Sequence, residues 1–134
     1  MINTEAQRHR EVLESDLTGT VIGAAIEVHR TLGPGLLESV YEECLCHELA
    51  LRGIRFERQV ELPLIYKDAV LNAALRIDIV VEGSVIVEVK AIEHVLPVHG
   101  AQLLSYMRLS HTRVGLLLNF NSKTMKDGIT RRVI

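Results

Sequence analysis

The sequence predicts an α/β (α+β) fold in the order α-α-β-β-β-α-β, with a mixed sheet flanked by helices. Three segments repeat apolar residues every three or four positions, as amphipathic helices do, and the Val- and Ile-rich segments between them are typical of strands. The chain has 134 residues, 48% hydrophobic and 24% charged, which favours one compact domain and excludes a disordered or fibrous chain.

Two helices are expected to open the fold. The first takes Ser15 or Asp16 as its N-cap and ends at Gly33-Pro34-Gly35, because these residues bracket a run of apolar residues at helical spacing. The second covers about Leu36–Arg52, and Gly53 stands where a glycine commonly ends a helix. The fold is therefore expected to begin with a pair of helices joined by a short glycine-rich turn.

A meander of three antiparallel strands is expected next, because the apolar period changes from 3.6 to 2 after the second helix. The strands lie around Val60–Tyr66, Val70–Val81 and Val85–Ile92, and turn-forming residues separate them. The sheet is thus predicted to start with two hairpins.

A third helix and a central strand are expected to complete the sheet. Pro97 stands where a helix N1 proline belongs, and helical spacing continues to about Ser110. Val114–Phe120 is apolar on both faces, as in a strand covered by helices on both sides. Ile129–Ile134 is predicted as a short last strand or an irregular tail.

Composition and charge exclude several classes of protein. The formal net charge is −2 and aromatic residues make up 4%, so neither an overall basic surface nor an aromatic stacking platform for single strands is expected. No apolar run approaches the ~20 residues of a membrane span, which favours a cytoplasmic protein without a membrane partner. Residues 1–15 are expected to form a frayed lead and residues 16–134 a single domain.

The two cysteines are expected to be unreactive. Cys44 and Cys46 would point about 200° apart on a helix, where neither a disulfide nor a shared zinc ion forms easily. Both are therefore interpreted as small, partly buried thiols.

The second and third expected strands carry two carboxylates and a lysine on one face. Strand alternation gives one side to Ile77, Ile79, Val81, Val85, Val87 and Val89, and the other to Asp78, Glu88 and Lys90. The strands share these faces only if a three-residue loop pairs Val81 with Val85. That register sets Asp78 opposite Glu88, with Cβ atoms about 4.5–5.5 Å apart.

Two carboxylates this close repel each other unless a cation lies between them. Oxygen ligands of this kind suit Mg²⁺ or Mn²⁺ better than zinc. Lys90, on the same face, could then hold the attacking water or stabilise charge that develops on a phosphoryl oxygen. The alternative is a solvated strand face held by ion pairs, which an isolated Asp with a Glu-x-Lys does not exclude.

Two further segments accompany these carboxylates. They read Gly33-Pro34-Gly35-Leu36-Leu37-Glu38-Ser39-Val40-Tyr41 and Gln102-Leu103-Leu104-Ser105-Tyr106. With Gly35, Glu38 and Tyr41 at matching spacing, the chain resembles the GxxExxY protein family, which looks like a minimal branch of the PD-(D/E)xK nuclease superfamily. The resemblance covers about residues 16–134 and implies a restriction-endonuclease-like core.

The resemblance also implies roles for individual residues. Asp78, Glu88 and Lys90 match the signature positions, although Ile77 stands where the literal motif has proline. Glu38 would be the acidic residue from the helical region. The metal set would then comprise Glu38, Asp78, Glu88 and the carbonyl of Val89. Two further residues match the Gln-x-x-x-Tyr element of RecB-like nucleases and would contact substrate, namely Gln102 and Tyr106.

Several of these residues also have structural explanations. A carboxylate at Glu38 suits the first turn of a helix whatever its function. Gly33 and Gly35 are interpreted as turn residues, and Tyr41 as a core residue with its hydroxyl bonded near the site. Tyr106 could equally be a core residue, and Gln102 could simply cap or pack the third helix.

Histidines and basic residues leave further alternatives open. His29 is either a core residue or an additional metal ligand, a role that a histidine of the N-terminal helix has in some RecB-like enzymes. Candidate phosphate contacts, which could equally be solvated charges, are Arg52, Arg55, Arg58, Lys123, Lys126, Arg131 and Arg132.

The sequence therefore favours a nuclease-like enzyme that uses Mg²⁺ or Mn²⁺ to hydrolyse phosphodiester bonds. The alternative is a catalytically weak or inactive module of the same fold that binds nucleic acid or protein. The expected partner is nucleic acid, DNA in preference to RNA. A symmetric homodimer is one arrangement by which so small a domain could embrace a duplex.

Overall fold

A computed structural model describes the backbone of residues 4–134 and their side chains except those of residues 9–12 and 73–74. Its elements are α1 Glu5–Leu32, α2 Glu38–Leu51, β1 Phe56–Tyr66, β2 Ala69–Val81, β3 Val85–Lys90, α3 Pro97–Ser110, β4 Val114–Asn119, the 3-10 helix η1 Lys126–Gly128 and β5 Ile129–Val133. The predicted order of helices and strands is confirmed, and the last segment forms a strand.

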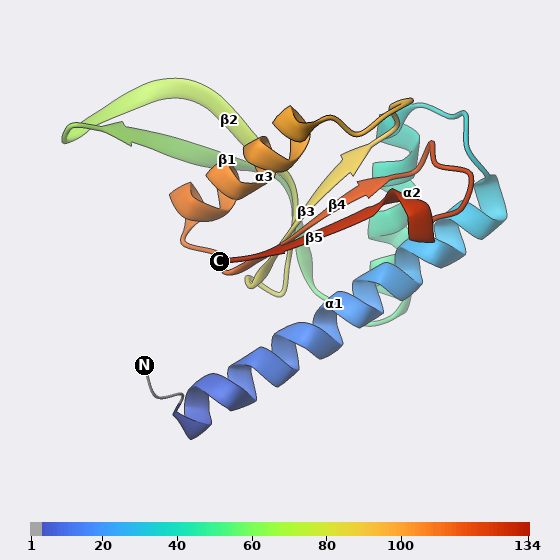
Figure 1. Cartoon of the computed structure of the whole chain (residues 1–134), viewed down its shortest axis with the longest axis horizontal. Coiled ribbons are helices and arrows are strands. Elements are labelled where there is room, and N and C mark those ends of the chain that lie inside the picture. The colour runs from blue at the N-terminus through green and yellow to red at the C-terminus, as the bar shows by residue number, and fades with distance from the viewer. Residues whose placement is uncertain (1–3) are drawn as a thin grey trace.

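A five-stranded sheet lies at the centre, with its strands in the spatial order β1-β2-β3-β4-β5 (Figure 1). The sheet is mixed, as predicted. β3 and β4 are parallel because α3 carries the chain back between them, and the other neighbours are antiparallel. α1 and α2 cover one face of the sheet and α3 covers the other (Figure 1).

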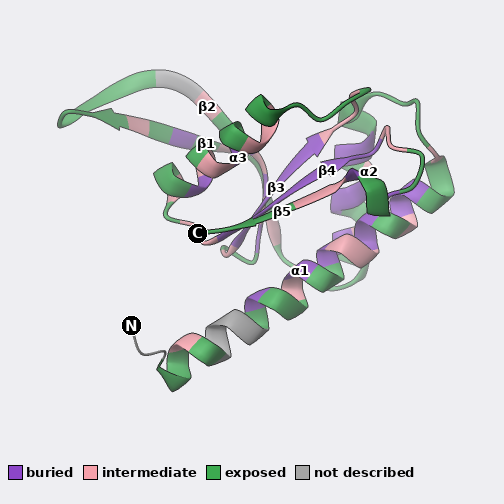
Figure 2. Cartoon of the chain, viewed as in Figure 1, coloured by how far each residue is buried: buried purple, intermediate pink, exposed green. Residues whose placement is uncertain are grey.

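Two apolar clusters hold these layers together. The larger one joins α1 and α2 to the sheet and includes Val21, Ala25, Tyr41, Leu45, Leu49, Val87, Leu116 and Leu118. The smaller one lies under α3 and includes Leu62, Ile77, Ile86, Leu103, Met107 and Leu117. β4 contributes to both clusters and is buried along its whole length, as predicted for a strand covered on both faces (Figure 2).

Close packing of α3 on β4 depends on a glycine. A Cβ built on Gly115 would lie 2.7 Å from the Met107 sulfur and 2.9 Å from a methyl carbon of Leu103. A larger residue would therefore push α3 away from the strand on which it packs.

The first helix begins earlier than the sequence predicts. Thr4 caps it through a reciprocal pair of 3.0 Å hydrogen bonds with Gln7, in which each backbone N–H meets the other side chain. Ser15 and Asp16 lie inside the helix, so the predicted start there is wrong, and the part of the expected lead from Glu5 onward is helical. The reason is that this capping box supplies a start where no apolar pattern marks one.

Length alone does not make α1 a membrane span. Among the described residues, no helix has both the length and the apolar composition needed to cross a bilayer.

Other predicted boundaries hold closely. α3 spans the predicted Pro97–Ser110, and Gly53 follows α2 with a φ of 71°. β1 begins at Phe56, before the predicted Val60. Both cysteines have free thiols, as predicted, with Cys46 buried.

Candidate active site

β2 and β3 part at the two predicted carboxylates. Val81 pairs with Val85 and Ile79 with Val87, which confirms the predicted three-residue loop and its register. The backbone ladder ends at that second pair. Beyond it, the Asp78 N–H donates to Glu88 Oε1 at 3.3 Å, and the Val89 N–H donates to Asp78 Oδ2 at 2.8 Å. Carboxylate oxygens therefore replace backbone carbonyls at this point of the sheet.

The end of this ladder also explains why the prediction that Ile77 and Ile79 share one face of the sheet is wrong. Ile77 packs in the cluster under α3, whereas Ile79 packs in the cluster under α1 and α2. Strict alternation predicts one face for both residues. The alternation does not extend across Asp78, because β2 has left β3 there and Gln59 of the neighbouring strand has a φ of 50°.

Glu88 is the most buried of the candidate catalytic carboxylates, with 4% of its surface exposed. Burial, and after it the negative charge of Asp78, raise its pKa to about 8 against the opposing effects of the Asp78 N–H and the Lys90 charge. Two acidic groups thus share one partly enclosed space, and the inner one prefers to keep its proton near neutral pH.

Glu38 and Lys90 lie within electrostatic reach of the same centre. Burial raises the pKa of Glu38, the Lys90 charge lowers it, and the Asp78 charge raises it again. The Ala91 backbone N–H also lowers the pKa of Glu38. Glu38, Asp78, Glu88 and Lys90 therefore lie close enough for their charges to act on one another.

Tyr41 fixes the turn from which Glu38 projects. Its hydroxyl donates to the Gly33 carbonyl at 2.5 Å and accepts from the Leu36 N–H at 3.1 Å. Its ring is fully buried and stacks on Phe120, with the ring centroids 4.8 Å apart. The tyrosine is a core residue that holds the start of α2, which confirms the structural interpretation.

Asn119 fixes the chain just beyond Lys90. Its Oδ1 accepts from the Ile92 N–H at 3.0 Å, and its Nδ2 donates to the Ile92 carbonyl at 2.9 Å. The Phe120 N–H donates to the Lys90 carbonyl at 2.8 Å. The sequence did not identify Asn119, because an asparagine at the end of an apolar strand also suits an ordinary turn.

We expect Asn119→Ala to lower the free energy of unfolding by about 1–3 kcal/mol, because both polar backbone groups of Ile92 would lose their partner. Urea denaturation measures this change. The half-buried Asn121 gives the matched control, and Asn121→Ala should cost less. Equal stability of Asn119→Ala and the wild type would show that the clamp contributes nothing.

Gln102 and Tyr106 form a pair of their own on α3. The Gln102 Nε2 donates to the Tyr106 hydroxyl at 3.2 Å, and Tyr106 packs against the smaller apolar cluster. In the described part of the chain, no hydrogen bond joins either residue to the carboxylates. The predicted shared helical face is present, and the hydrogen bond on it joins the side chains of Gln102 and Tyr106.

The candidate phosphate-binding arginines before and within β1 have acidic partners. Arg52 pairs with Glu48 and Arg55 with Glu82. Arg58 contacts two glutamates of α2. The remaining candidates are exposed, namely Lys123, Lys126, Arg131 and Arg132.

His29 has a structural partner. It is 8% exposed, and its Nε2 lies 2.8 Å from the Ser122 carbonyl, to which it donates. This bond ties α1 to the segment that follows β4. His29 is therefore a buried residue whose Nε2 is bonded to a backbone carbonyl.

The four acidic and basic residues are close without forming a closed ligand cage. Among the described side chains, no three His, Cys, Asp or Glu residues are grouped tightly enough to hold a metal ion. One oxygen of Asp78 and one of Glu88 accept backbone N–H groups instead. Among the described hydrogen bonds, Asp78 Oδ1 and Glu88 Oε2 accept no backbone N–H, so these are the oxygens that remain for a shared ion.

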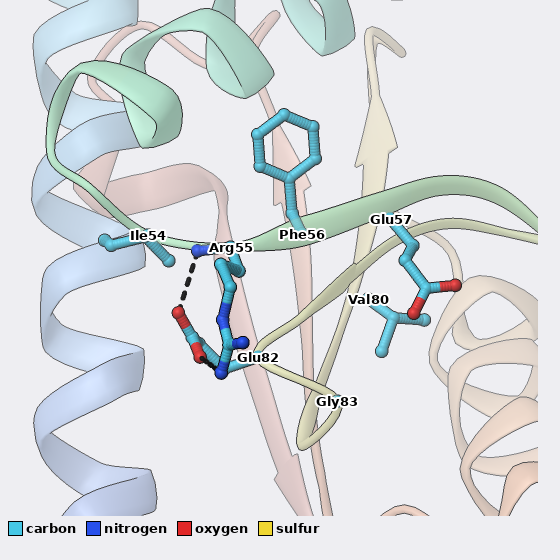
Figure 3. Close-up of a pocket in the computed structure, with 7 residues that line it drawn as sticks. All are labelled: Ile54, Arg55, Phe56, Glu57, Val80, Glu82 and Gly83. Atoms are coloured by element: carbon cyan, nitrogen blue, oxygen red, sulfur yellow. Dashed lines mark hydrogen bonds and ion pairs between the residues drawn. The ribbon is translucent and has the colours of Figure 1, made fainter.

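None of the four described cavities is lined by Glu38, Asp78, Glu88 or Lys90. A cavity of about 600 Å³ lies at the turn between β2 and β3, at the end of β3 remote from Lys90 (Figure 3). The Arg55 N–H donates to Glu82 Oε1 at 2.8 Å in its wall. The candidate site is therefore defined by its gathered charges.

The raised pKa of Glu88 makes stability depend on pH. Below its ordinary pKa of 4.5, Glu88 is protonated in both states; between 4.5 and about 8, only the native state keeps the proton. The native state therefore loses stability as pH rises through this window. We expect the Tm of the metal-free protein to fall from pH 5 to pH 8 by more than that of Glu88→Gln. Glu57→Gln, at an exposed position, provides the control and should show the wild-type dependence of Tm on pH. An equal dependence of Tm on pH in Glu88→Gln and the wild type would contradict the prediction.

Comparison with known proteins agrees with this geometry. The family model described as the PD-(D/E)XK nuclease superfamily matches residues 15–132, which include all four gathered residues. No curated protein and no solved structure gives a significant match. The chain belongs to the PD-(D/E)XK nuclease superfamily.

Proposed function

We propose that this protein is a nuclease that uses Mg²⁺ or Mn²⁺ to hydrolyse phosphodiester bonds of nucleic acid. The observation that carries the proposal is the contact between Asp78 and Glu88 where the β2–β3 ladder ends, with Glu38 and Lys90 in electrostatic reach. Superfamily membership supports the same reaction class.

The donor set suits a hard divalent cation. Glu38, Asp78 and Glu88 offer carboxylate oxygens, the ligands that Mg²⁺ and Mn²⁺ prefer. Each of Glu38 and Glu88 has a pKa that the Asp78 charge raises, so a nearby dication would relieve a repulsion already present. An ion bound there would polarise a phosphoryl oxygen of the substrate and lower the pKa of a bound water molecule.

The backbone of Val89 supports its assignment as a fourth ligand. The Lys90 carbonyl accepts from the Phe120 N–H and so points toward β4. Because neighbouring residues of a strand point their polar groups to opposite sides, the Val89 carbonyl points toward β2, as its N–H does. It lies beyond the last pair of the β2–β3 ladder, beside Asp78.

Lys90 is the proposed electrostatic catalyst. Its ammonium group would orient the attacking water or stabilise negative charge that develops on the phosphoryl oxygens. The charge of Lys90 already lowers the pKa of both Glu38 and Glu88, which supports its proximity to the reacting centre. The clamp on Ile92 restricts the chain next to it.

Gln102 and Tyr106 are proposed to steady the substrate backbone from α3. We expect Gln102→Ala to weaken substrate binding and to reduce turnover less than loss of Lys90 does, because a positioning contact contributes less than a charge at the reacting atoms. Binding assays and single-turnover rates measure both effects. A variant changed only in stability would remove Gln102 from the site.

The finer identity of the protein also belongs to this proposal. Gly35, Glu38 and Tyr41 support membership of the GxxExxY branch, and DNA is the proposed substrate. A symmetric homodimer would let two such centres face a duplex. Light scattering with and without DNA tests the dimer, and a monomer in both conditions would exclude it.

Cleavage of a panel of nucleic acids tests the proposal. Purified protein should cut at least one of linear duplex, circular duplex, single-stranded DNA or RNA when Mg²⁺ or Mn²⁺ is present, and none when a chelator is added. Binding without cleavage by wild-type protein would instead support an inactive binding module of the same fold.

A further inference from the structure

Asp78 lies at a point where side chains replace backbone pairing on both sides of β2. Toward β3, the last paired residue of β2 is Ile79, which directly follows Asp78 in the sequence. Toward β1, Arg58 pairs with Ile79 and Val60 with Ile77, so Gln59 is the β1 residue beside Asp78. The amide Nε2 of Gln59 lies 3.5 Å from Asp78 Oδ1, at the outer limit of a hydrogen bond.

The backbone of Gln59 has an unusual conformation for a strand. Its φ is 50°, in the left-handed region that costs free energy for any residue with a Cβ. Backbone strain of this kind persists only where surrounding contacts stabilise it, and it concentrates at functional sites. The side chain of Gln59 supplies such contacts.

A buried glutamate holds the Gln59 amide. Gln59 Nε2 donates to Glu42, with its two oxygens at 3.0 and 3.1 Å, and Glu42 is 6% exposed. Arg58 donates to the same carboxylate from Nε and Nη2, at 3.1 and 2.9 Å. Glu42 is thus fixed by an ion pair, and through it the amide of Gln59 is fixed as well.

We infer that Gln59 is a positioning residue that orients the Asp78 carboxylate for the proposed reaction. A primary amide has two N–H donors, so one can remain on Glu42 while the other is directed to Asp78 Oδ1. The Val89 N–H donates to the other oxygen, Oδ2. Donors on both sides define the plane of the carboxylate, as partners of metal-binding carboxylates commonly do. The inference rests on the proposed function, because it assigns Asp78 as a ligand.

The variant Gln59→Gly separates this role from a structural one. Glycine tolerates a positive φ, so the relieved backbone should offset the lost hydrogen bonds and leave the Tm close to that of the wild type. We expect the affinity for Mn²⁺, measured by calorimetric titration, to fall by about tenfold or more, the scale seen when a partner of a metal ligand is removed. Unchanged affinity would overturn the inference.

His111 provides the matched control. It also has a positive φ, 56°, and it lies at the end of α3. His111→Gly therefore makes the same backbone change but leaves the contact between the Gln59 amide and the Glu42 carboxylate in place. Its Mn²⁺ affinity should equal that of the wild type. The loss from Gln59→Gly should disappear in an Asp78→Asn background, because the two residues act through one carboxylate.

A measurement on the metal-free protein distinguishes the failure of this inference from failure of the proposed function. Wild-type protein that binds no Mn²⁺ would count against the proposed function alone. In that case, Asp78→Asn should still shift the Gln59 side-chain amide resonance in a ¹⁵N–¹H spectrum, since the two groups are neighbours. An unshifted resonance would overturn the link between Gln59 and Asp78.

Discussion

Lys90→Ala is expected to lower the single-turnover rate of phosphodiester cleavage by about 100-fold or more while leaving substrate affinity nearly unchanged. This is the scale of loss when a preorganised electrostatic group is removed from a reacting centre. The Lys90 charge lowers the pKa of both Glu38 and Glu88, and its backbone carbonyl accepts from the Phe120 N–H, which fixes the strand from which the side chain extends.

Lys67→Ala serves as the control for this experiment. Lys67 is exposed at the turn of the β1–β2 hairpin, so the variant removes the same charge far from the carboxylates. It should cut at the wild-type rate. If Lys90→Ala also cleaves normally, the proposed mechanism is wrong or the activity belongs to a contaminant.

Asp78→Asn is expected to abolish the rise in Tm that millimolar Mn²⁺ produces in the wild-type protein. An ion that binds only the native state stabilises it in proportion to the logarithm of its concentration over its dissociation constant. The amide oxygen of asparagine is a poorer ligand and lacks the charge. Without metal, the variant should be as stable as the wild type or more so, because it removes a negative charge beside the buried Glu88.

Asp68→Asn makes the same chemical change at an exposed position in the hairpin turn. Thermal unfolding of both variants, with and without Mn²⁺, measures the effect. The response of Asp68→Asn should match that of the wild type. An equal Mn²⁺ response in Asp78→Asn would contradict a shared site at Asp78 and Glu88.

The register of β2 and β3 is the feature that the sequence predicted best. Apolar alternation on both strands requires a three-residue loop, and the observed pairing of Val81 with Val85 has that loop. The contact between Asp78 and Glu88 follows from the register. Local patterns also sufficed for α3 and the buried β4, because proline at N1 and a continuous apolar run are strong signals.

Contacts between segments distant in sequence could not be predicted. Gln59 and Glu42 meet because α2 packs beside β1, and no local spacing relates them. Asn119 binds Ile92 across the parallel pair of β3 and β4. The side assigned to Ile77 failed for the same reason, since alternation along one strand contains no information about where its neighbour departs.

The most direct test of the proposed metal centre is a crystal structure of the protein soaked in Mn²⁺, with anomalous scattering used to locate the ion. We expect a peak within coordination distance of oxygens of Asp78 and Glu88, with Asp78 Oδ2 still accepting from the Val89 N–H. A fully occupied Mn²⁺ site elsewhere, with no peak beside Asp78 and Glu88, would contradict the proposed metal centre.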